Sequence, residues 1–343
     1  MTPATWPREA RLEERLLFVD PSRGRWTHHV VRELPELLRP GDLLVANDAA
    51  TIPASLFATT AGGAAVEIRL AATTDERTWQ AVLFGEGDWH TRTEERASPP
   101  PVAPGDVVHV SDALDATILG VDPRSPRLVT LRFSAEGAAL WTALHRFGRP
   151  VQYAYVRDWL APWHVQTAFA SRPWAVEMPS AGRPITVEIL ARLRRRGIAV
   201  ARLTHAAGLS STGDPAIDRV LPFPERYEIP GETVTALART RAEGGRAVAV
   251  GTTVVRALEG CASSHGGEVV SGRGITDLHI GEGFVPRVVD GLLTGLHEAG
   301  TSHRTLLHAF AGEPVLAGAW ADAEERSYLA HEFGDHALLL RTP

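Results

Sequence analysis

The stretch "RAVAVGTTVVRALEG", residues 246–260, decides the fold of this chain. It opens with four small or β-branched apolar residues, Ala247 to Val250, which favour a buried strand. Gly-Thr-Thr follows at once, and the residues beyond it are typical of a helix. A glycine at such a junction lets the backbone turn or approach a ligand closely, and a threonine can cap the next helix. The stretch therefore predicts a strand-to-helix junction of an α/β fold.

The same alternation of strands and helices is found on both sides of a different central region. Residues 11–57 and those from 150 onward have α/β texture, which predicts a largely parallel sheet. Between them, short alternating segments are separated by Gly, Pro and Asp turns, as in an antiparallel sheet or small barrel. We predict a mainly parallel-sheet α/β domain, residues 1–60 and 150–343, interrupted by an inserted antiparallel β-barrel-like domain, residues 61–149.

The composition is typical of a soluble globular protein. Of the 343 residues, 44% are hydrophobic and 22% are charged, and no apolar run is long enough to span a bilayer. The first residues mix acidic and basic side chains without an apolar segment, so we expect no secretory signal. The single cysteine, Cys261, excludes an internal disulfide and a cysteine-based zinc site, and we expect no metal. These features favour the cytoplasm.

The strand-to-helix junction also predicts a ligand site. In open α/β sheets, ligands bind beyond the carboxyl ends of the strands, where helix N-termini present free N–H groups. Gly251, Thr252 and Arg256 would then face a ligand. The pattern fits a second interpretation equally well, in which a threonine only caps the helix and Arg256 and Glu259 form an exposed i,i+3 pair.

The junction resembles the signature of the S-adenosylmethionine:tRNA ribosyltransferase-isomerase family of queuosine biosynthesis. Five further segments resemble blocks of that family, in the family's order: "LLRPGDLLVANDAATIPASL", "VQTAFA", "MPSAGRPIT", "LHEAGTSHRTLLHAF" and "FGDHALLL". The resemblance spans nearly the whole chain. It implies the same architecture, an α/β domain with an inserted barrel.

The resemblance implies that S-adenosylmethionine is the cosubstrate. In the family reaction its ribosyl moiety is transferred to a 7-deazaguanine in tRNA and rearranged, and adenine and methionine are released. The residues that the resemblance places at the cosubstrate are Asn47, Pro179, Ser180, Ala181, Gly182, Gly251, Thr252, Thr253, Arg256 and Glu259. Arg256 suits the methionine carboxylate, since a guanidinium and a carboxylate can form a fork.

The reaction also requires a general base, because a sulfonium makes neighbouring C–H groups acidic. Glu177 is one candidate, since it stands beside the "MPSAG" turn where the family has a small residue. Asp48 and His297 match family positions and are the other two. Each has a structural alternative: a strand-end charge for Glu177, a turn for Asp48 and a structural role for His297.

Several residues depart from the family pattern. Polar or cationic family residues are replaced at six positions: Ala49, Ala50, Ser55, Pro184, Leu221 and Phe223. Because such side chains bind RNA phosphates and bases, their loss and the net charge of −6 predict weak tRNA affinity. A small-molecule acceptor, or a non-catalytic S-adenosylmethionine or nucleoside binder, are the alternatives. Three aromatic residues flank the site segments, Trp163, His164 and Trp174; we predict core packing for them, with stacking on a purine as the alternative.

Overall fold

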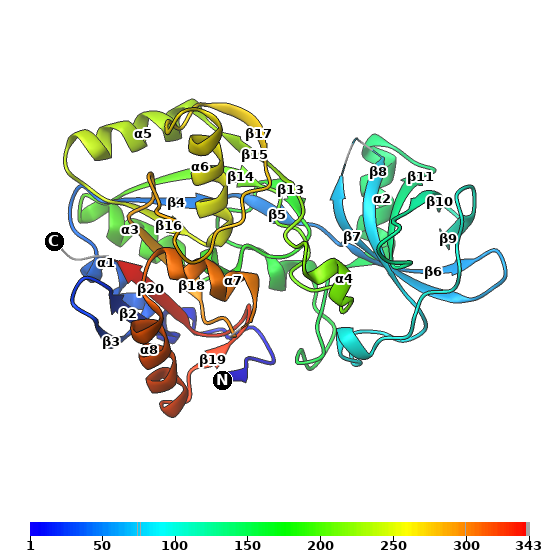
Figure 1. Ribbon diagram of the computed structural model, residues 1–343, viewed down its shortest axis with the longest axis horizontal. Helices are drawn as coiled ribbons and strands as arrows, with labels where there is room; N and C mark the ends of the chain where they lie inside the picture. Colours follow the sequence, from blue (N-terminus) through cyan, green and yellow to red (C-terminus); the bar gives the residue numbers. More distant parts are fainter. Residues whose placement is uncertain (74, 76, 299, 341–343) are drawn as a thin grey trace.

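The computed structural model describes residues 1–73, 75, 77–298 and 300–340. Figure 1 shows two bodies side by side: a large sheet flanked by helices, and a smaller barrel. The blue, green, yellow and red parts of the chain build the large sheet, whereas the cyan part builds most of the barrel. The barrel is therefore an insertion into the α/β part of the chain.

The large body contains one mixed sheet. Within the described residues its nine strands follow the order β17-β15-β14-β4-β16-β18-β20-β2-β3. Their bounds are β2 (Arg15–Asp20), β3 (Arg25–Val30), β4 (Leu43–Asn47), β14 (Ala199–His205), β15 (Glu225–Ile229), β16 (Ala247–Val250), β17 (Gly272–Thr276), β18 (Gly291–Gly295) and β20 (His336–Leu340). The central run β14-β4-β16-β18 is parallel, whereas β15, β17, β3 and the β18–β20 pair are antiparallel. The predicted parallel sheet is thus confirmed only for its centre.

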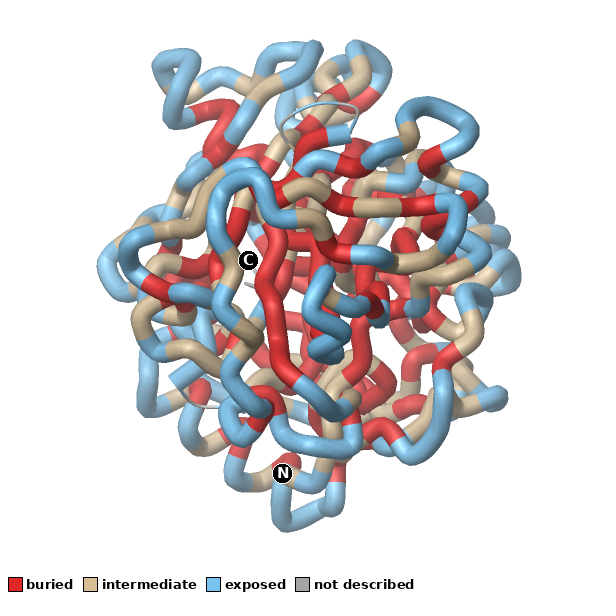
Figure 2. Tube along the Cα trace, turned by 90° about the vertical axis from the view of Figure 1, so that its right-hand side faces the viewer, coloured by how far each residue is buried: buried red, intermediate tan, exposed pale blue. Residues whose placement is uncertain are grey.

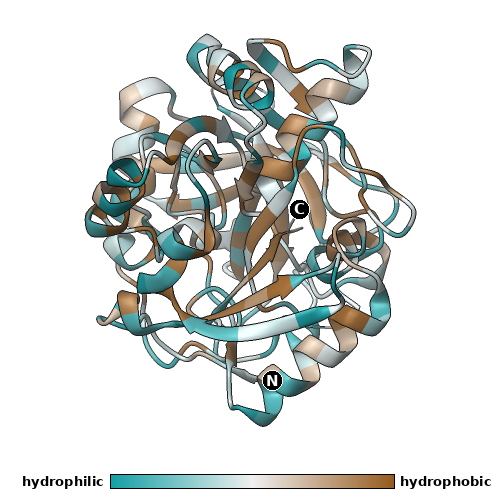
Figure 3. Ribbon diagram, turned by 90° about the vertical axis from the view of Figure 1, so that its left-hand side faces the viewer, coloured by the Kyte–Doolittle hydropathy of each residue, from teal (hydrophilic) through white to brown (hydrophobic). Residues whose placement is uncertain are grey.

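Helices cover both faces of this sheet. One face carries α5 (Gly231–Ala242), α6 (Thr252–Ser264) and α8 (Glu313–Glu325), and the other carries α1 (Leu34–Leu37) and α3 (Val187–Arg195). Figure 2, seen from the barrel side, shows buried stretches of chain in the interior and exposed stretches along much of the periphery. Figure 3 shows hydrophobic strands in the interior and helices of mixed hydropathy around them.

The central strand β4 explains why a short apolar run folds this way. All five of its residues are buried. Leu43 and Val45 pack under the α6 face, and Leu44 and Ala46 under the α3 face. Because successive side chains of a strand point to opposite faces, a strand covered on both sides has to be apolar throughout.

The smaller body is a closed antiparallel barrel, as predicted. Its strands are β6 (Ser55–Thr60), β7 (Ala65–Thr73), β8 (Thr78–Phe84), β9 (Val107–Ser111), β10 (Leu114–Val121) and β11 (Leu128–Phe133). Pairing of β6 with β9 closes the ring, and α2 (Gly137–Phe147) and β12 (Gly148–Arg149) complete it. β6 begins before the boundary predicted at residue 61, so the division of the chain into domains stays a prediction.

Short elements join the two bodies and shape the segments around the site. They are β1 (Thr2–Pro3), β5 (Ala49–Thr51), β13 (Arg172–Ala175), β19 (Leu329–Ala330), α4 (Pro215–Asp218), α7 (Ser302–Leu306) and the 3-10 helices η1 (Arg11–Glu13), η2 (Val31–Glu33), η3 (Thr93–Glu95), η4 (Pro162–Val165), η5 (Ser180–Gly182) and η6 (Leu307–Ala309). The parallel pair β5–β13 brings the segment leading to η5 next to the end of β4. Among the described helices, none has the length and apolar character needed to cross a bilayer.

Candidate active site

A cavity of about 420 Å³ lies at the carboxyl ends of the central strands. Its lining comes from the end of β18 and from the segments that follow β13, β14, β16, β17 and β18: Glu177–Ala181, Ala207–Ser210, Gly251–Thr253, Leu278–Gly281, Thr294, Gly295 and His297. Residues of α4, α6 and α7 complete the walls. This is the place where the strand-to-helix junction predicts a ligand site.

The structure brings most of the predicted site residues together. Nine of them line the cavity: Glu177, Pro179, Ser180, Ala181, Gly251, Thr252, Thr253, Arg256 and His297. The other four predicted residues do not line it: Asn47, Asp48, Gly182 and Glu259.

Arg256 is held inside the cavity wall by a partner that the sequence did not suggest. Its side chain is only 9% exposed and forms an ion pair, through Nη1, with Glu225 at the start of β15. Nε donates to the carbonyl oxygen of Leu278 at 3.2 Å. Among the described residues, the buried Nη2 has no hydrogen-bond partner. The predicted exposed pair of Arg256 with Glu259 is therefore wrong. Because Nη1 and Nε already have partners, Arg256 retains one unpartnered nitrogen for a ligand and not the two that a fork with a carboxylate requires.

Glu259 has a structural role instead. It is buried on α6, and its carboxylate accepts three backbone N–H groups, those of Arg287, Val288 and Val289, each at 3.0 Å. These bonds fix the loop that precedes β18. Because its oxygens are occupied in this way, Glu259 does not reach the cavity, contrary to the predicted contact with the cosubstrate.

Asn47 ties two strand ends together behind the cavity. Its Oδ1 accepts the amides of Ala49 and His205 at 3.0 and 2.9 Å, and its Nδ2 donates to the His205 carbonyl at 2.9 Å. Nδ2 also lies 3.4 Å from Oγ1 of Thr253, which lines the cavity. Asn47 therefore positions Thr253 and lies outside the lining itself.

Asp48 and Gly182 are also supports. Asp48 is half-buried, and its Oδ1 accepts the hydroxyl of Thr204 at 2.6 Å. An ideal Cβ on Gly182 would lie 3.4 Å from Cγ2 of Thr167, so Thr167 packs against η5 at this position. Both residues hold segments that line the cavity, whereas neither faces it.

Glu177 lies on the cavity wall with one oxygen already bonded. The hydroxyl of Tyr153 and the backbone amide of Ser210, at 3.1 Å, both donate to its Oε1. Burial raises the pKa of Glu177, although these hydrogen bonds oppose the rise. The position of Glu177 therefore supports a cavity group over an exposed strand-end charge.

Glu225 is the site residue that sequence reasoning missed. It accepts the amide of Gly208 at 2.8 Å and the ion pair from Arg256, and it lines the cavity. Burial raises its pKa, and the nearby guanidinium of Arg256 opposes that rise. The one signal in the sequence was the family-like run "ERYE" at 225–228, which by itself gave no position in space.

Two histidines form a neutral pair in the wall. The rings of His297 and His303 stack with centroids 4.8 Å apart and planes 23° apart. Burial lowers the pKa of His297 well below its ordinary value, and it lowers the pKa of His303 to about 4. His297 Nε2 lies 2.9 Å from Oγ1 of Thr294. Near pH 7 these rings therefore act as hydrogen-bonding groups and not as cations.

The described residues of the site do not form an evident set of metal ligands. In the part of the chain that the structure describes, no group of three or more His, Cys, Asp or Glu side chains is arranged to hold an ion. The titratable groups of the wall include Arg256 with its unpartnered nitrogen, two carboxylates with raised pKa values, Glu177 and Glu225, and the two neutral histidines; Asp218, Arg219 and His279 also line it.

The positions that depart from the family pattern are packing positions. Five of them are buried: Ala49, Ser55, Pro184, Leu221 and Phe223. Ala50 is half-buried. Leu221 and Phe223 belong to the apolar cluster of the barrel. Leu221 also lines the active-site cavity.

A concave site at the ends of parallel strands, with perturbed carboxylates and an unused buried guanidinium nitrogen, defines an α/β protein with an enzyme-like site for a small charged ligand. The particular family follows from comparison with known proteins. The family model described as queuosine biosynthesis protein matches residues 2–339, and the chain belongs to this family. This confirms the family indicated by the six sequence blocks.

Individual relatives agree with this assignment. A protein of Azoarcus sp. strain BH72 named S-adenosylmethionine:tRNA ribosyltransferase-isomerase is 36% identical over 341 residues, which are 98% of this chain and 93% of that protein. A protein of the same name from Gloeobacter violaceus is 35% identical over 98% of this chain and 92% of its own length. The crystal structure of S-adenosylmethionine tRNA ribosyltransferase from Thermotoga maritima covers 98% of this chain and 96% of its own, with 28% identity and a TM-score of 0.53.

Proposed function

We propose that this chain is an S-adenosylmethionine-dependent ribosyltransferase-isomerase that acts on a 7-deazaguanine in tRNA, the type of activity for which its relatives are named. One observation carries the proposal. Arg256, whose buried Nη2 has no partner among the described residues, and Glu177 line a single cavity. S-adenosylmethionine has a carboxylate and a sulfonium, so it presents one charge complementary to each group.

The N-terminal turn of α6 supports binding of the methionine end. Gly251 has φ +98°, a conformation that favours glycine, and a Cβ there would lie 3.4 Å from Cβ of Ala181. The glycine therefore lets the turn of α6 approach the wall formed by η5. Thr252 and Thr253 then place hydroxyl and backbone N–H groups at the positive end of a 13-residue helix, beside Arg256.

Glu177 is the residue we assign as general base. Tyr153 and Ser210 hold its Oε1, which fixes the carboxylate and leaves Oε2 to remove a proton from a carbon next to the sulfonium. Burial makes this carboxylate a stronger base, and the positive charge of the bound sulfonium favours its ionised form. The proton remains on Glu177 until it is returned to the product or to solvent.

The other two base candidates take different roles in this proposal. Asp48 does not line the cavity, and it supports the end of β4 through Thr204. His297 does line it, and its neutral ring can donate to or accept from a substrate hydroxyl. We therefore place His297 at a ribose oxygen and keep Glu177 as the base.

The names of the relatives support tRNA as the acceptor. The decisive experiment incubates the protein with S-adenosylmethionine, with and without tRNA that carries the 7-deazaguanine. Adenine and methionine are followed by mass spectrometry. We expect both products only when this tRNA is present. Release with a small acceptor alone would favour the small-molecule alternative, and no release would favour a binding protein.

A further inference from the structure

Trp163 is one of the most exposed large apolar side chains in the described part of the chain. It lies on η4 and is 71% exposed, so the predicted core packing is wrong for this residue. An indole ring in water loses the stabilisation that burial would give it, and solitary exposed apolar residues are ordinary. The surroundings of Trp163 are what distinguish it.

Trp163 begins a row of aromatic and cationic groups on the surface. Its ring centroid lies 5.6 Å from that of His164, which in turn lies 4.9 Å from that of Trp6, both in edge-to-face geometry. The guanidinium of Arg157 lies 5.0 Å from the centroid of Trp6. We call these four residues the aromatic row. Edge-to-face packing supports the exposed indole from one side and leaves ring surface in contact with solvent.

Positive charge surrounds the aromatic row. A recess beside it, of about 580 Å³, is lined by Trp6, Pro7, Arg8, Glu9, Arg11, Arg157 and His164. Arg8 is paired with Asp335 and Glu14, whereas Arg11 and Arg157 form no ion pair with any described residue. Glu9 is the one carboxylate of the lining, so two unpaired guanidinium groups face one acid there.

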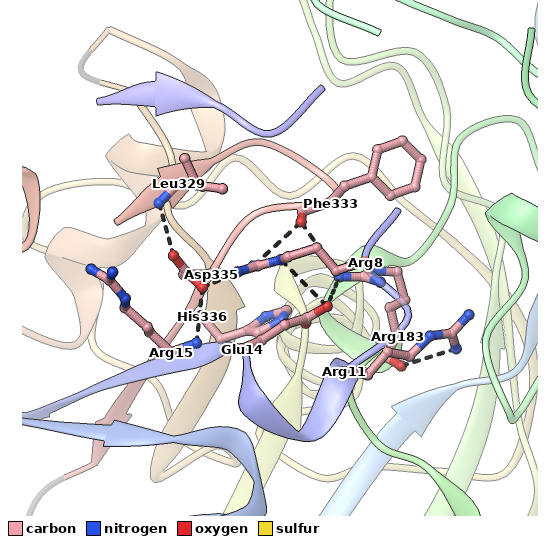
Figure 4. A network of polar contacts seen from close by, with 9 residues as sticks. All are labelled: Arg8, Arg11, Glu14, Arg15, Arg183, Leu329, Phe333, Asp335 and His336. Carbon is pink, nitrogen blue, oxygen red and sulfur yellow. Dashed lines mark hydrogen bonds and ion pairs between the residues drawn. The ribbon is translucent and has the colours of Figure 1, made fainter. Parts of the chain in front are cut away.

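The aromatic row adjoins the wall of the active-site cavity. Arg11 donates to the carbonyl oxygen of Arg183 at 3.5 Å, a contact drawn in Figure 4, and Arg183 directly follows η5. From the other side, η4 ends two residues before Thr167, which packs on Gly182 of η5. The recess beside the row and η4 are therefore both linked to η5, whose Ser180 and Ala181 line the cavity.

We propose that the aromatic row is a platform on which an unpaired base of the RNA substrate stacks, while Arg11 and Arg157 contact the adjoining phosphates. This inference rests on the proposed function, which places one nucleotide of tRNA in the cavity. RNA-binding proteins recognise splayed-out bases of single-stranded loops by stacking them on aromatic and arginine planes. The row presents both kinds of plane, together with the charge that an RNA backbone requires.

The test compares Trp163→Ala, Trp163→Phe and Arg157→Ala with the wild-type protein. Binding to an anticodon stem-loop RNA is measured by fluorescence anisotropy, and binding to S-adenosylmethionine by calorimetry. We expect Trp163→Ala to weaken RNA binding by roughly 5- to 100-fold, and Trp163→Phe to retain most of it, because phenylalanine also stacks. The affinity for S-adenosylmethionine should not change. A blunt RNA duplex, which offers no unpaired base, should bind wild type and Trp163→Ala equally.

Arg195→Ala on the exposed end of α3 is the matched charge control. Equal losses in Arg157→Ala and Arg195→Ala, or full affinity in Trp163→Ala, would overturn the platform while leaving the proposed reaction intact. Absence of RNA binding by the wild type would overturn the platform and the tRNA acceptor together. Loop binding that depends on Trp163, without cleavage of S-adenosylmethionine, would support the platform and contradict the proposed reaction.

Discussion

Two of the buried clusters of charge in this protein differ in whether they line the active-site cavity. In the cluster of Figure 4, Glu14 pairs with Arg183 and lies 2.9 Å from His336, and Asp335 pairs with Arg8 at 2.8 Å. The side chains of Glu14 and Arg183 are 0% exposed, and no member of this cluster lines the active-site cavity. We call it the closed cluster.

The second cluster consists of Arg256, Glu225 and Glu177, and we call it the cavity cluster. It contains the same kinds of side chain as the closed cluster. Arg256 and Glu225 neutralise each other, and Glu177 adds a second carboxylate with a raised pKa. Unlike the closed cluster, these three residues line the cavity. The comparison teaches that buried charge alone does not mark function. The closed cluster should control folding stability, and the cavity cluster should control binding and catalysis.

The largest effect should follow from Glu177→Gln. Glutamine keeps the shape and can still accept from Tyr153, but it cannot take up the proton that the reaction releases. Loss of a general base typically lowers the rate ~10²–10⁴-fold. Adenine release under single-turnover conditions measures this loss. The unfolding temperature should stay close to wild type, and the affinity for S-adenosylmethionine should fall by much less than the rate. Turnover equal to wild type would show that Glu177 is not the base.

In the closed cluster, Glu14→Gln should act on stability. It leaves the guanidinium of Arg183 buried without its carboxylate, which costs about 3–5 kcal/mol of unfolding free energy. Urea unfolding measures the change, and the folded variant should bind S-adenosylmethionine normally. The adjacent Glu13→Gln is the control, because its ion pair with Arg32 is more than half exposed and should contribute below about 1 kcal/mol. Equal costs for the two variants would contradict the comparison.

The local pattern of the chain predicted the place of the site but not the ion pairs that hold its side chains. Ala247 to Val250 followed by Gly251 defined a strand end and a helix start, and the cavity lies there. Those features depend on residues close in sequence. Arg256, by contrast, pairs with a carboxylate 31 residues away, and Arg183 with one 169 residues away. Sequence spacing carries no direct information on such tertiary pairs.

The same limit explains why the order of the strands and the packing of the departures could not be predicted. Strand β20 lies between β18 and β2 and is antiparallel to β18, which no local periodicity specifies. Phe223 is a departure from the family pattern in the sequence, and only the structure shows that it packs in the barrel cluster. For Trp163 we predicted packing in the core, and the structure shows an exposed side chain.

Arg256→Met should weaken S-adenosylmethionine binding by roughly 10- to 100-fold, because a hydrogen bond to a charged group contributes about 1.5–3 kcal/mol. Adenosine, which has no carboxylate, should bind almost as it does to wild type. Calorimetry with both ligands measures the difference. The double variant Arg256→Met/Glu225→Gln removes both partners of the ion pair and controls for the buried, unpaired carboxylate. Equal losses for the two ligands in the double variant would make Arg256 a purely structural residue.

The smallest effect concerns Glu332, which lies at the edge of the closed cluster, next to Phe333. The carbonyl of Phe333 accepts from Arg183 at 3.4 Å, and Glu332 itself accepts the hydroxyl of Tyr155. Burial raises the pKa of Glu332 from 4.5 to about 7. The folded protein therefore holds this proton more tightly than the unfolded chain. The resulting stabilisation is complete below pH 4.5 and is lost as the pH rises through about 7.

Between pH 5 and pH 8 the unfolding temperature of wild type should fall a few degrees further than that of Glu332→Gln, which cannot titrate. Thermal unfolding across this range measures both proteins, and parallel curves would show that Glu332 titrates alike in the folded and unfolded states.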